Sequence, residues 1–217
     1  ALGDAAANVY AIAGEGVAAL NTVDGWMGSL QAFEGGHGYW LVATDDFSFS
    51  FNNTDADGNG IARAEDAVQV APRIVPEEFS YVQSVDQAFY FLIGVTIRGE
   101  ALTSEDIIIA YNGDQVVGSR YYNVDGYTDV PVMGVDSDNE ECSKYCKKDD
   151  VVSFKVWDDS EQKLVDMKSD RTIEWKTALS RTTDGPVMGV DSDIVSTVSL
   201  TDVFLPTEVS LSNAYPN

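Results

Sequence analysis

The chain is short of positive charge and of the residues that most often carry nucleophilic or metal chemistry. Its 217 residues contain 13 Lys and Arg against 36 Asp and Glu, with one His and two Cys. The net charge of −23 opposes binding to nucleic-acid phosphates and to an anionic membrane surface. We therefore expect no nucleic-acid partner, and we expect cations to be the more favourable ligands.

Long apolar runs and helical periodicity are also missing. A membrane-spanning helix needs a stretch of about 18 or more apolar residues, and the sequence has none. We therefore expect no insertion into a membrane. The chain has no Gly-x-Ser-x-Gly motif, and its single histidine, His37, lies among glycines. The sequence therefore gives no indication of a Ser-His-Asp or similar nucleophilic site. Paired acids for glycoside hydrolysis stay open, because sequence does not give the distance between carboxylates. The sequence favours a protein that is not an enzyme.

The chain does show alternation of apolar and polar residues, and this alternation predicts β-strands. Hydrophobic residues make up 44% of the chain, enough for a packed core. Asn112-Gly113-Asp114 separates two apolar runs and predicts a hairpin turn, because Asn and Gly accept positive φ. We predict an all-β fold, an antiparallel β-sandwich that is immunoglobulin-like or jelly-roll-like, with a smaller N-terminal β segment packed on it.

Composition changes along the chain divide it into three parts. Residues 1–70 are expected to form a small N-terminal β module with an acidic loop of the calcium-binding type, and residues 71–205 the main sandwich. Residues 206–217 are expected to form a linker. The chain begins with Ala1 and not with Met, so we expect it to be a processed or excised part of a longer precursor.

An eleven-residue motif occurs twice in the sequence. Thr128–Asp138 returns as Thr183–Asp193 with ten of the eleven positions identical. Each copy has a Pro, a short apolar stretch, a Gly that permits a bend and an Asp-Ser-Asp end. We interpret the copies as two equivalent loops that bind the same kind of cation or meet the same partner surface.

Calcium is the cofactor that the acidic residues predict. Five residues match the ligand positions one, three, five, seven and twelve of an EF-hand-type loop: Asp55, Asp57, Asn59, Ile61 and Asp66. Ile61 would contribute its backbone carbonyl oxygen. An ordinary turn rich in Asp and Asn is the alternative.

The repeat adds two further candidate pairs of calcium ligands. Asp136 with Asp138, and Asp191 with Asp193, place carboxylates two residues apart, which a loop can direct to one side. A solvated acidic loop end is the alternative for both pairs.

The two cysteines lie four residues apart in a short polar segment. Cys142 and Cys146 are too close for a zinc site without further ligands. We expect them to form a local disulfide that closes a turn, which fits an oxidising, extracellular setting. Two reduced thiols are the alternative.

Aromatic residues on predicted strands could bind sugars by stacking. The candidates for such a platform are Trp26, Tyr39, Trp40 and Trp157. Packing in the core or across strands is the commoner role of such residues.

Several stretches of strand and turn carry a resemblance to a family: Gly14–Ala19, Gly25–Leu30, Gly38–Leu41, Gln87–Phe91, Ile109–Gly118, Tyr127–Gly134, Val152–Asp158 and Leu211–Asn217. They resemble β modules near the C-terminal ends of large secreted proteins of Bacteroidetes-like and Marinimicrobia-like bacteria. In that family a type IX secretion sorting domain follows such a module, so the resemblance implies that residues 206–217 are a linker toward a missing sorting domain. The resemblance implies export through the outer membrane to the cell surface or the extracellular space.

These observations lead to one expected function and one alternative. We expect a non-catalytic, calcium-stabilised protein, secreted or on the cell surface, that acts in adhesion or in the self-assembly of an extracellular structure. Its partner would then be a second copy of itself. The alternative is a carbohydrate-binding module of a polysaccharide-degrading enzyme, with a surface polysaccharide as the partner.

Overall fold

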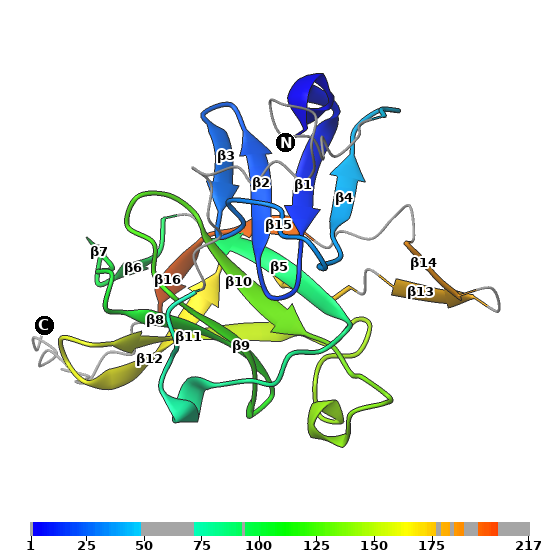
Figure 1. The fold of residues 1–217 in the computed structure, drawn as a ribbon. Coiled ribbons are helices and arrows are strands. Elements are labelled where there is room, and N and C mark those ends of the chain that lie inside the picture. Colours follow the sequence, from blue (N-terminus) through cyan, green and yellow to red (C-terminus); the bar gives the residue numbers. More distant parts are fainter. Residues whose placement is uncertain are drawn as a thin grey trace, which may run out of the picture.

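A computed structural model of the chain describes residues 2–48, 72–92, 94–176, 179–182, 185–188 and 195–203. Strands dominate these residues, and the helices among them are three short 3-10 helices, η1 (Gly3–Asn8), η2 (Glu77–Phe79) and η3 (Glu140–Cys142). The predicted all-β class is confirmed. Figure 1 shows the strands arranged in layers, with the N-terminal strands on one side of the molecule.

The N-terminal sheet has four antiparallel strands in the order β3-β2-β1-β4. Its strands are β1 (Val9–Ala13), β2 (Ala18–Thr22), β3 (Gly25–Gly28) and β4 (Trp40–Ala43). Its two faces are covered differently. Ala11 and Leu20 pack toward the rest of the molecule, whereas Ile12 and Ala19 pack with Leu2 and Leu30 on the outer side.

A central sheet of three strands follows, in the order β10-β5-β15. It contains β5 (Gln87–Leu92), β10 (Thr128–Met133) and β15 (Val195–Val198). β10 pairs with β5 in antiparallel fashion, and β15 pairs with β5 in parallel. Every residue of β5 and β10 is buried, as expected for strands that are covered on both faces.

The largest sheet has seven strands in the order β7-β6-β16-β12-β11-β8-β9. The strands are β6 (Thr96–Ile97), β7 (Glu100–Ala101), β8 (Ile107–Asn112), β9 (Gln115–Tyr121), β11 (Val152–Asp158), β12 (Lys163–Ser169) and β16 (Leu200–Asp202). The predicted hairpin is confirmed, since Asn112 lies opposite Gln115 and Gly113 has a φ of 59°. A separate two-stranded sheet contains β13 (Leu179–Thr182) and β14 (Gly185–Met188).

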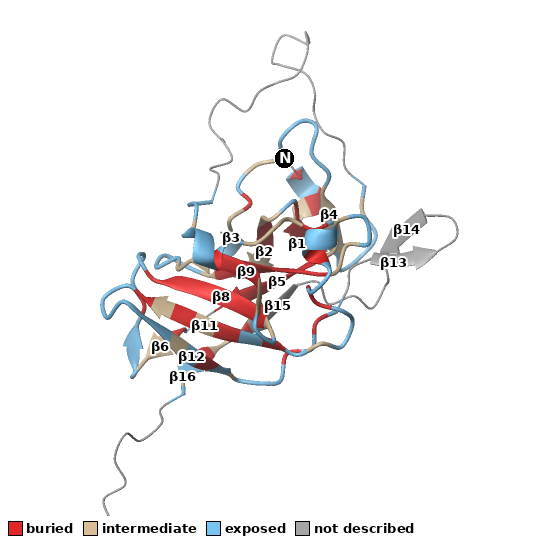
Figure 2. Ribbon diagram, turned by 90° about the horizontal axis from the view of Figure 1, so that it is seen from below, coloured by how far each residue is buried: buried red, intermediate tan, exposed pale blue. Residues whose placement is uncertain are grey.

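Alternation along β5 places the central sheet between the other two. Ala88, Tyr90 and Leu92 belong to the core shared with the seven-stranded sheet. Phe89 and Phe91 belong to a second core with Ala11 and Leu20 of the N-terminal sheet. Figure 2 shows β5 and β8 buried along their lengths. The sandwich therefore carries a third layer of strands.

The first copy of the repeat forms a strand, which corrects the interpretation of the copies as loops. Residues 128–133 are strand β10, and the loop is confined to the acidic end that follows. A strand was not expected because Pro131 lies inside it, but edge strands such as β10 tolerate Pro. Within the second copy, Gly185–Met188 also form a strand, β14.

Gly134 of the first copy is required by packing and not by a bend. A Cβ atom at this position would lie 2.4 Å from the indole ring of Trp175. Trp175 is 1% exposed, and its Nε1 donates a hydrogen bond of 3.1 Å to the carbonyl oxygen of Val132. Only glycine lets the ring lie this close to the end of β10.

Candidate functional site

Part of the predicted calcium site lies outside the described residues. This holds for the whole EF-hand-type loop and for the acidic end of the second repeat copy: Asp55, Asp57, Asn59, Ile61, Asp66, Asp191 and Asp193. The calcium prediction for these positions therefore stays a prediction from sequence.

Asp136 and Asp138 lie in the loop after β10. The Asp136 carboxylate accepts a hydrogen bond of 2.9 Å from the backbone N–H of Asp138, and Ser137 Oγ lies 3.3 Å from Asp138 Oδ1. Local turn contacts thus use one carboxylate oxygen of each Asp. Within the described part of the chain, no group of three or more acidic, His or Cys side chains is arranged to hold a metal ion.

The predicted aromatic platform is not assembled. Tyr39 packs on the outer face of the N-terminal sheet, in edge-to-face contact with Phe33 at 4.7 Å between ring centroids, whereas Trp40 packs against the core on the inner face. Trp26 is 38% exposed on β3. Trp157 lies on the seven-stranded sheet, beside Phe79. These aromatic rings therefore lie on separate surfaces.

The cysteines are free thiols in the structure, which differs from the predicted disulfide. Cys142 and Cys146 are both buried in the main core. Burial raises the pKa of Cys146 to about 12 and also raises the pKa of Cys142. Backbone hydrogen bonds tie Cys146 to Met133 and Val135 at the end of β10. Both groups are therefore poor nucleophiles at neutral pH.

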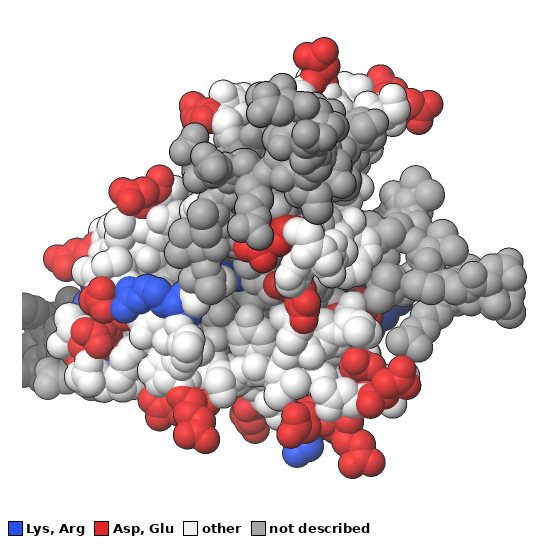
Figure 3. All heavy atoms as spheres, viewed as in Figure 1, with Lys and Arg blue, Asp and Glu red and all other residues white. Residues whose placement is uncertain are grey.

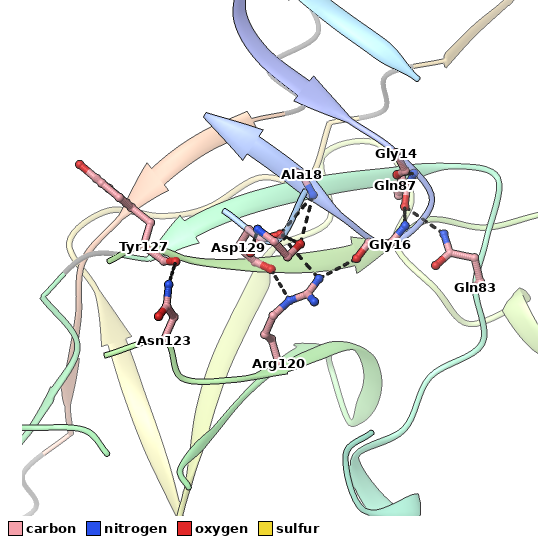
Figure 4. A network of polar contacts seen from close by, with 10 residues as sticks. Gly14, Gly16, Ala18, Gln83, Gln87, Arg120, Asn123, Tyr127 and Asp129 are labelled. Atoms are coloured by element: carbon pink, nitrogen blue, oxygen red, sulfur yellow. Dashed lines mark hydrogen bonds and ion pairs between the residues drawn. The ribbon is translucent and has the colours of Figure 1, made fainter. Parts of the chain in front are cut away.

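A buried polar cluster joins the three sheets, and we call it the interlayer network. Its side chains are Arg120 from β9, Asp129 from β10 and Gln87 from β5. Their partners in the N-terminal sheet and its loops are Gly14, Gly16, Ala18 and Ser29. Figure 4 shows Arg120 and Gln87 directed toward the loop between β1 and β2, and Asp129 beside Ala18 at the start of β2.

Asp129 is the centre of the interlayer network. Its carboxylate accepts hydrogen bonds from the backbone N–H groups of Ala18 at 3.2 Å and Ser29 at 3.0 Å, and from the Ser29 hydroxyl. The side chain is 3% exposed, and Arg120 Nη2 lies 3.6 Å from its Oδ2. Burial raises the pKa of Asp129, and the Arg120 guanidinium opposes part of this rise.

Arg120 reaches all three layers from a single side chain. It belongs to the seven-stranded sheet, its Nε donates to the carbonyl oxygen of Asp129 in the central sheet at 2.7 Å, and its Nη2 donates to the carbonyl oxygen of Gly16 at 2.6 Å. Its side chain is 10% exposed. A buried guanidinium with several acceptors is well suited to fix two surfaces in one register.

Gln87 completes the attachment of the β1–β2 loop. Its Nε2 donates to the carbonyl oxygen of Gly14 at 2.7 Å, and its Oε1 accepts from the N–H of Gly16 at 3.1 Å. Gln83 also donates to the same Oε1, at 2.9 Å. The polar backbone of the loop is thereby satisfied where the chain turns.

Sequence reasoning missed the role of this network. The repeat motif contains Asp129 but gives it no role, and no motif in the sequence contains Arg120. The available signal was a single Asp inside the apolar run from Thr128 to Met133, since a charge in a buried strand needs a partner. Its charged partner Arg120 is only nine residues away, but its backbone partner Ala18 could not be found from sequence, because it is 111 residues away.

The surface carries the acidic excess. Figure 3 shows Asp and Glu side chains spread over one face, with few Lys or Arg residues between them. Exposed ion pairs such as Arg73–Glu105 and Arg98–Glu161 use several of the basic groups. Among the helices of the described residues, none has the length and apolar character to span a bilayer.

Comparison with known proteins found no counterpart. No family model, no curated protein and no solved structure matches the chain. Inferences about its function therefore rest on its own residues and on the resemblance described above.

Proposed function

We propose that the chain is a non-catalytic β module of a secreted or cell-surface protein, and that it acts in adhesion or in calcium-dependent self-assembly. The observation that supports this most is the interlayer network. Arg120 and Asp129 fix the N-terminal sheet to the sandwich through buried contacts. A module that connects partners outside a cell must hold its layers in one arrangement, and this network serves that need.

The charge of the protein links assembly to calcium. A net charge of −23 makes the copies repel one another. Divalent cations held between carboxylates would reduce that repulsion, because Ca²⁺ takes six to eight oxygen ligands. The acidic loop ending in Asp136 and Asp138 and the sequence from Asp55 to Asp66 are the parts that we propose bind Ca²⁺.

The non-catalytic part of the proposal is supported by the chemistry of the described residues. The only histidine of the sequence, His37, lies 3.7 Å from Glu34 in an exposed position. Both thiols are buried, with raised pKa values. A nucleophile with an adjacent base, as covalent catalysis requires, is not formed by these groups.

Export by a type IX system is proposed from the resemblance of the short strand and turn segments. It agrees with a module that acts outside the cell. Carbohydrate binding has less support, because the candidate aromatics lie on separate surfaces and a stacking platform needs them on one.

Sedimentation of the whole chain over a wide concentration range, with calcium or with a chelator, tests the proposal. We expect oligomers that form with calcium and dissociate on chelation, together with a melting temperature that falls on chelation. Monomers at every concentration with calcium present would contradict the self-assembly part.

Two matched variants assign the calcium effect to a place in the sequence. Asp55→Asn with Asp57→Asn should remove most of the calcium-dependent rise in melting temperature. Asp45→Asn with Asp46→Asn makes the same charge change in an exposed turn and should leave that rise intact. Equal effects of the two double variants would argue against a calcium site at residues 55–66.

A further inference from the structure

The second copy of the repeat is a near duplicate of a core strand. Strand β14 has the sequence Gly-Pro-Val-Met and β10 contains Val-Pro-Val-Met, and the flanking residues Thr-Asp and Gly-Val-Asp-Ser-Asp are the same in both copies. Both strands are antiparallel members of their sheets. The chain thus contains two segments that meet the same requirements for pairing.

The contacts of β10 show what a strand needs in order to pair with β5. Val132 lies opposite Ala88 of β5, and both face the main core. Asp129 lies opposite Phe91 and joins the interlayer network. Strand β9 lies very close to Pro131 of β10. A Cβ atom on Gly118 of β9 would lie 1.6 Å from the Pro131 carbonyl oxygen.

In sequence, the second copy offers each of these groups again. Asp184, Pro186 and Val187 correspond to Asp129, Pro131 and Val132. The single difference is Gly185 in place of Val130, which is 0% exposed in the core. The second copy is therefore a competent but weaker partner for β5, since Gly leaves a gap in the core and lowers strand propensity.

The surroundings of β14 leave it available for another pairing. Among the described strands, β14 is hydrogen-bonded only to β13, in a sheet of two strands. A two-stranded sheet is marginal in water unless something else covers it. Figure 1 shows this hairpin beside the layered body and not within it.

We propose that β14 of one copy of this chain takes the place of β10 beside β5 of a second copy, giving strand-exchanged dimers. In the exchanged form, the contacts that β10 makes with β5 in the monomer would be made by the corresponding residues of β14, with Gly185 in place of Val130. β10 is buried on both faces, so exchange occurs while the chains fold together and not between finished monomers. The proposal deepens the self-assembly part of the proposed function and depends on it.

Cross-linking by register tests the exchange. Val132 lies opposite Ala88, so in the exchanged dimer Val187 takes that position. We would refold a chain carrying Ala88→Cys together with a chain carrying Val187→Cys, oxidise the mixture and map the disulfides by mass spectrometry. We expect a disulfide between positions 88 and 187 that joins the two chains.

A matched control and a second variant keep the test decisive. Ser180→Cys, in the strand opposite Val187, should give no disulfide to position 88. Gly185→Val completes the identity of the two copies and should raise the dimer fraction after refolding severalfold, whereas Ser180→Val should not.

Three results would overturn the exchange. The first is that refolded chains of both the native sequence and Gly185→Val stay monomeric. The second is that dimers form without the 88–187 disulfide. The third is that the 88–187 disulfide forms within a single monomeric chain that carries both cysteines. Calcium-dependent oligomers without the 88–187 disulfide would overturn the exchange alone and leave the self-assembly proposal standing.

Discussion

The two interfaces of the central sheet are built on different principles. Toward the seven-stranded sheet it shares a core of 22 buried residues, which includes Trp175 and Tyr90. Toward the N-terminal sheet it shares a core of six, four of which are Ala or Leu, together with the interlayer network. The first interface rests on apolar area. The second is smaller, and a few buried polar groups decide its register.

This difference predicts unequal consequences of substitution. Loss of one apolar side chain from the large core leaves a local cavity, but the remaining apolar contacts still hold the two sheets together. Loss of Arg120 would leave the buried Asp129 carboxylate without its cation and the Gly16 carbonyl without this donor, whereas Gln87 would still bind the β1–β2 loop. Both interfaces also need the close contact between β9 and β10.

Gly118→Ala should have the largest effect. Its Cβ would lie 1.6 Å from the Pro131 carbonyl oxygen, which is backbone and cannot rotate away. We expect a loss of stability of more than about 4 kcal/mol and little folded protein, measured by near-ultraviolet circular dichroism and soluble yield. Gly35→Ala is the control, because its Cβ would meet nothing within 4 Å. Equal yields of the two variants would show that β9 and β10 do not approach as described.

Arg120→Ala should lower the free energy of unfolding by about 3–5 kcal/mol, the range found when one partner of a buried ion pair is removed. The reason is the buried Asp129 carboxylate, which keeps its backbone donors but loses Arg120. Urea unfolding measures this. Arg98→Ala removes an exposed ion pair with Glu161 and should lower stability far less, because water screens exposed ion pairs. A loss for Arg120→Ala no larger than this would contradict the structural role of the network.

Asp129→Asn should reveal a smaller, pH-dependent effect. Burial raises the pKa of Asp129 above its ordinary value of 3.8. The folded state therefore binds a proton in a pH window where the unfolded state does not, and stability from this group falls as pH rises through the folded pKa. The stability difference between the native protein and Asp129→Asn should grow in favour of the native protein as the pH is lowered from neutral toward 3.8. A difference that shrinks on acidification would show that the pKa is lowered and not raised.

Thiol labelling should show the smallest effect of all, because it changes no contact. In the native protein both cysteines should resist a thiol reagent, since they are buried and their pKa values are raised. In denaturant without a reductant, both should react. If neither reacts after unfolding, the disulfide predicted from the sequence is present in the protein and the free thiols of the structure are wrong.

Much of the layered body was predictable from alternation and turn residues. The β8–β9 hairpin follows from Asn112-Gly113, and the N-terminal segment was expected to pack on a sandwich. Strand β10 was missed because Asp129 and Pro131 interrupt its apolar pattern, although edge strands accept Pro and a paired Asp can be buried. The sequence of strand β2 gives only a weak strand signal, because Ala18 and Ala19 are small.

The candidate site was less predictable, for a physical reason. The network depends on Arg120 meeting a backbone carbonyl of Gly16, 104 residues earlier in the chain. Backbone groups have no signature in a sequence, so local patterns cannot identify such a partner. The separation of the predicted platform residues, by contrast, follows in part from a local pattern, because alternation places the adjacent Tyr39 and Trp40 on opposite faces.

Hydrogen exchange of the Arg120→Ala variant tests the central claim most directly, namely that the interlayer network holds the N-terminal sheet to a sandwich whose own core is apolar. Amides of β1 and β2 should lose protection by a large factor relative to the native protein, while amides of β8 and β11 in the large core keep most of theirs. Equal loss of protection in both sheets, or no loss in β1 and β2, would contradict the account.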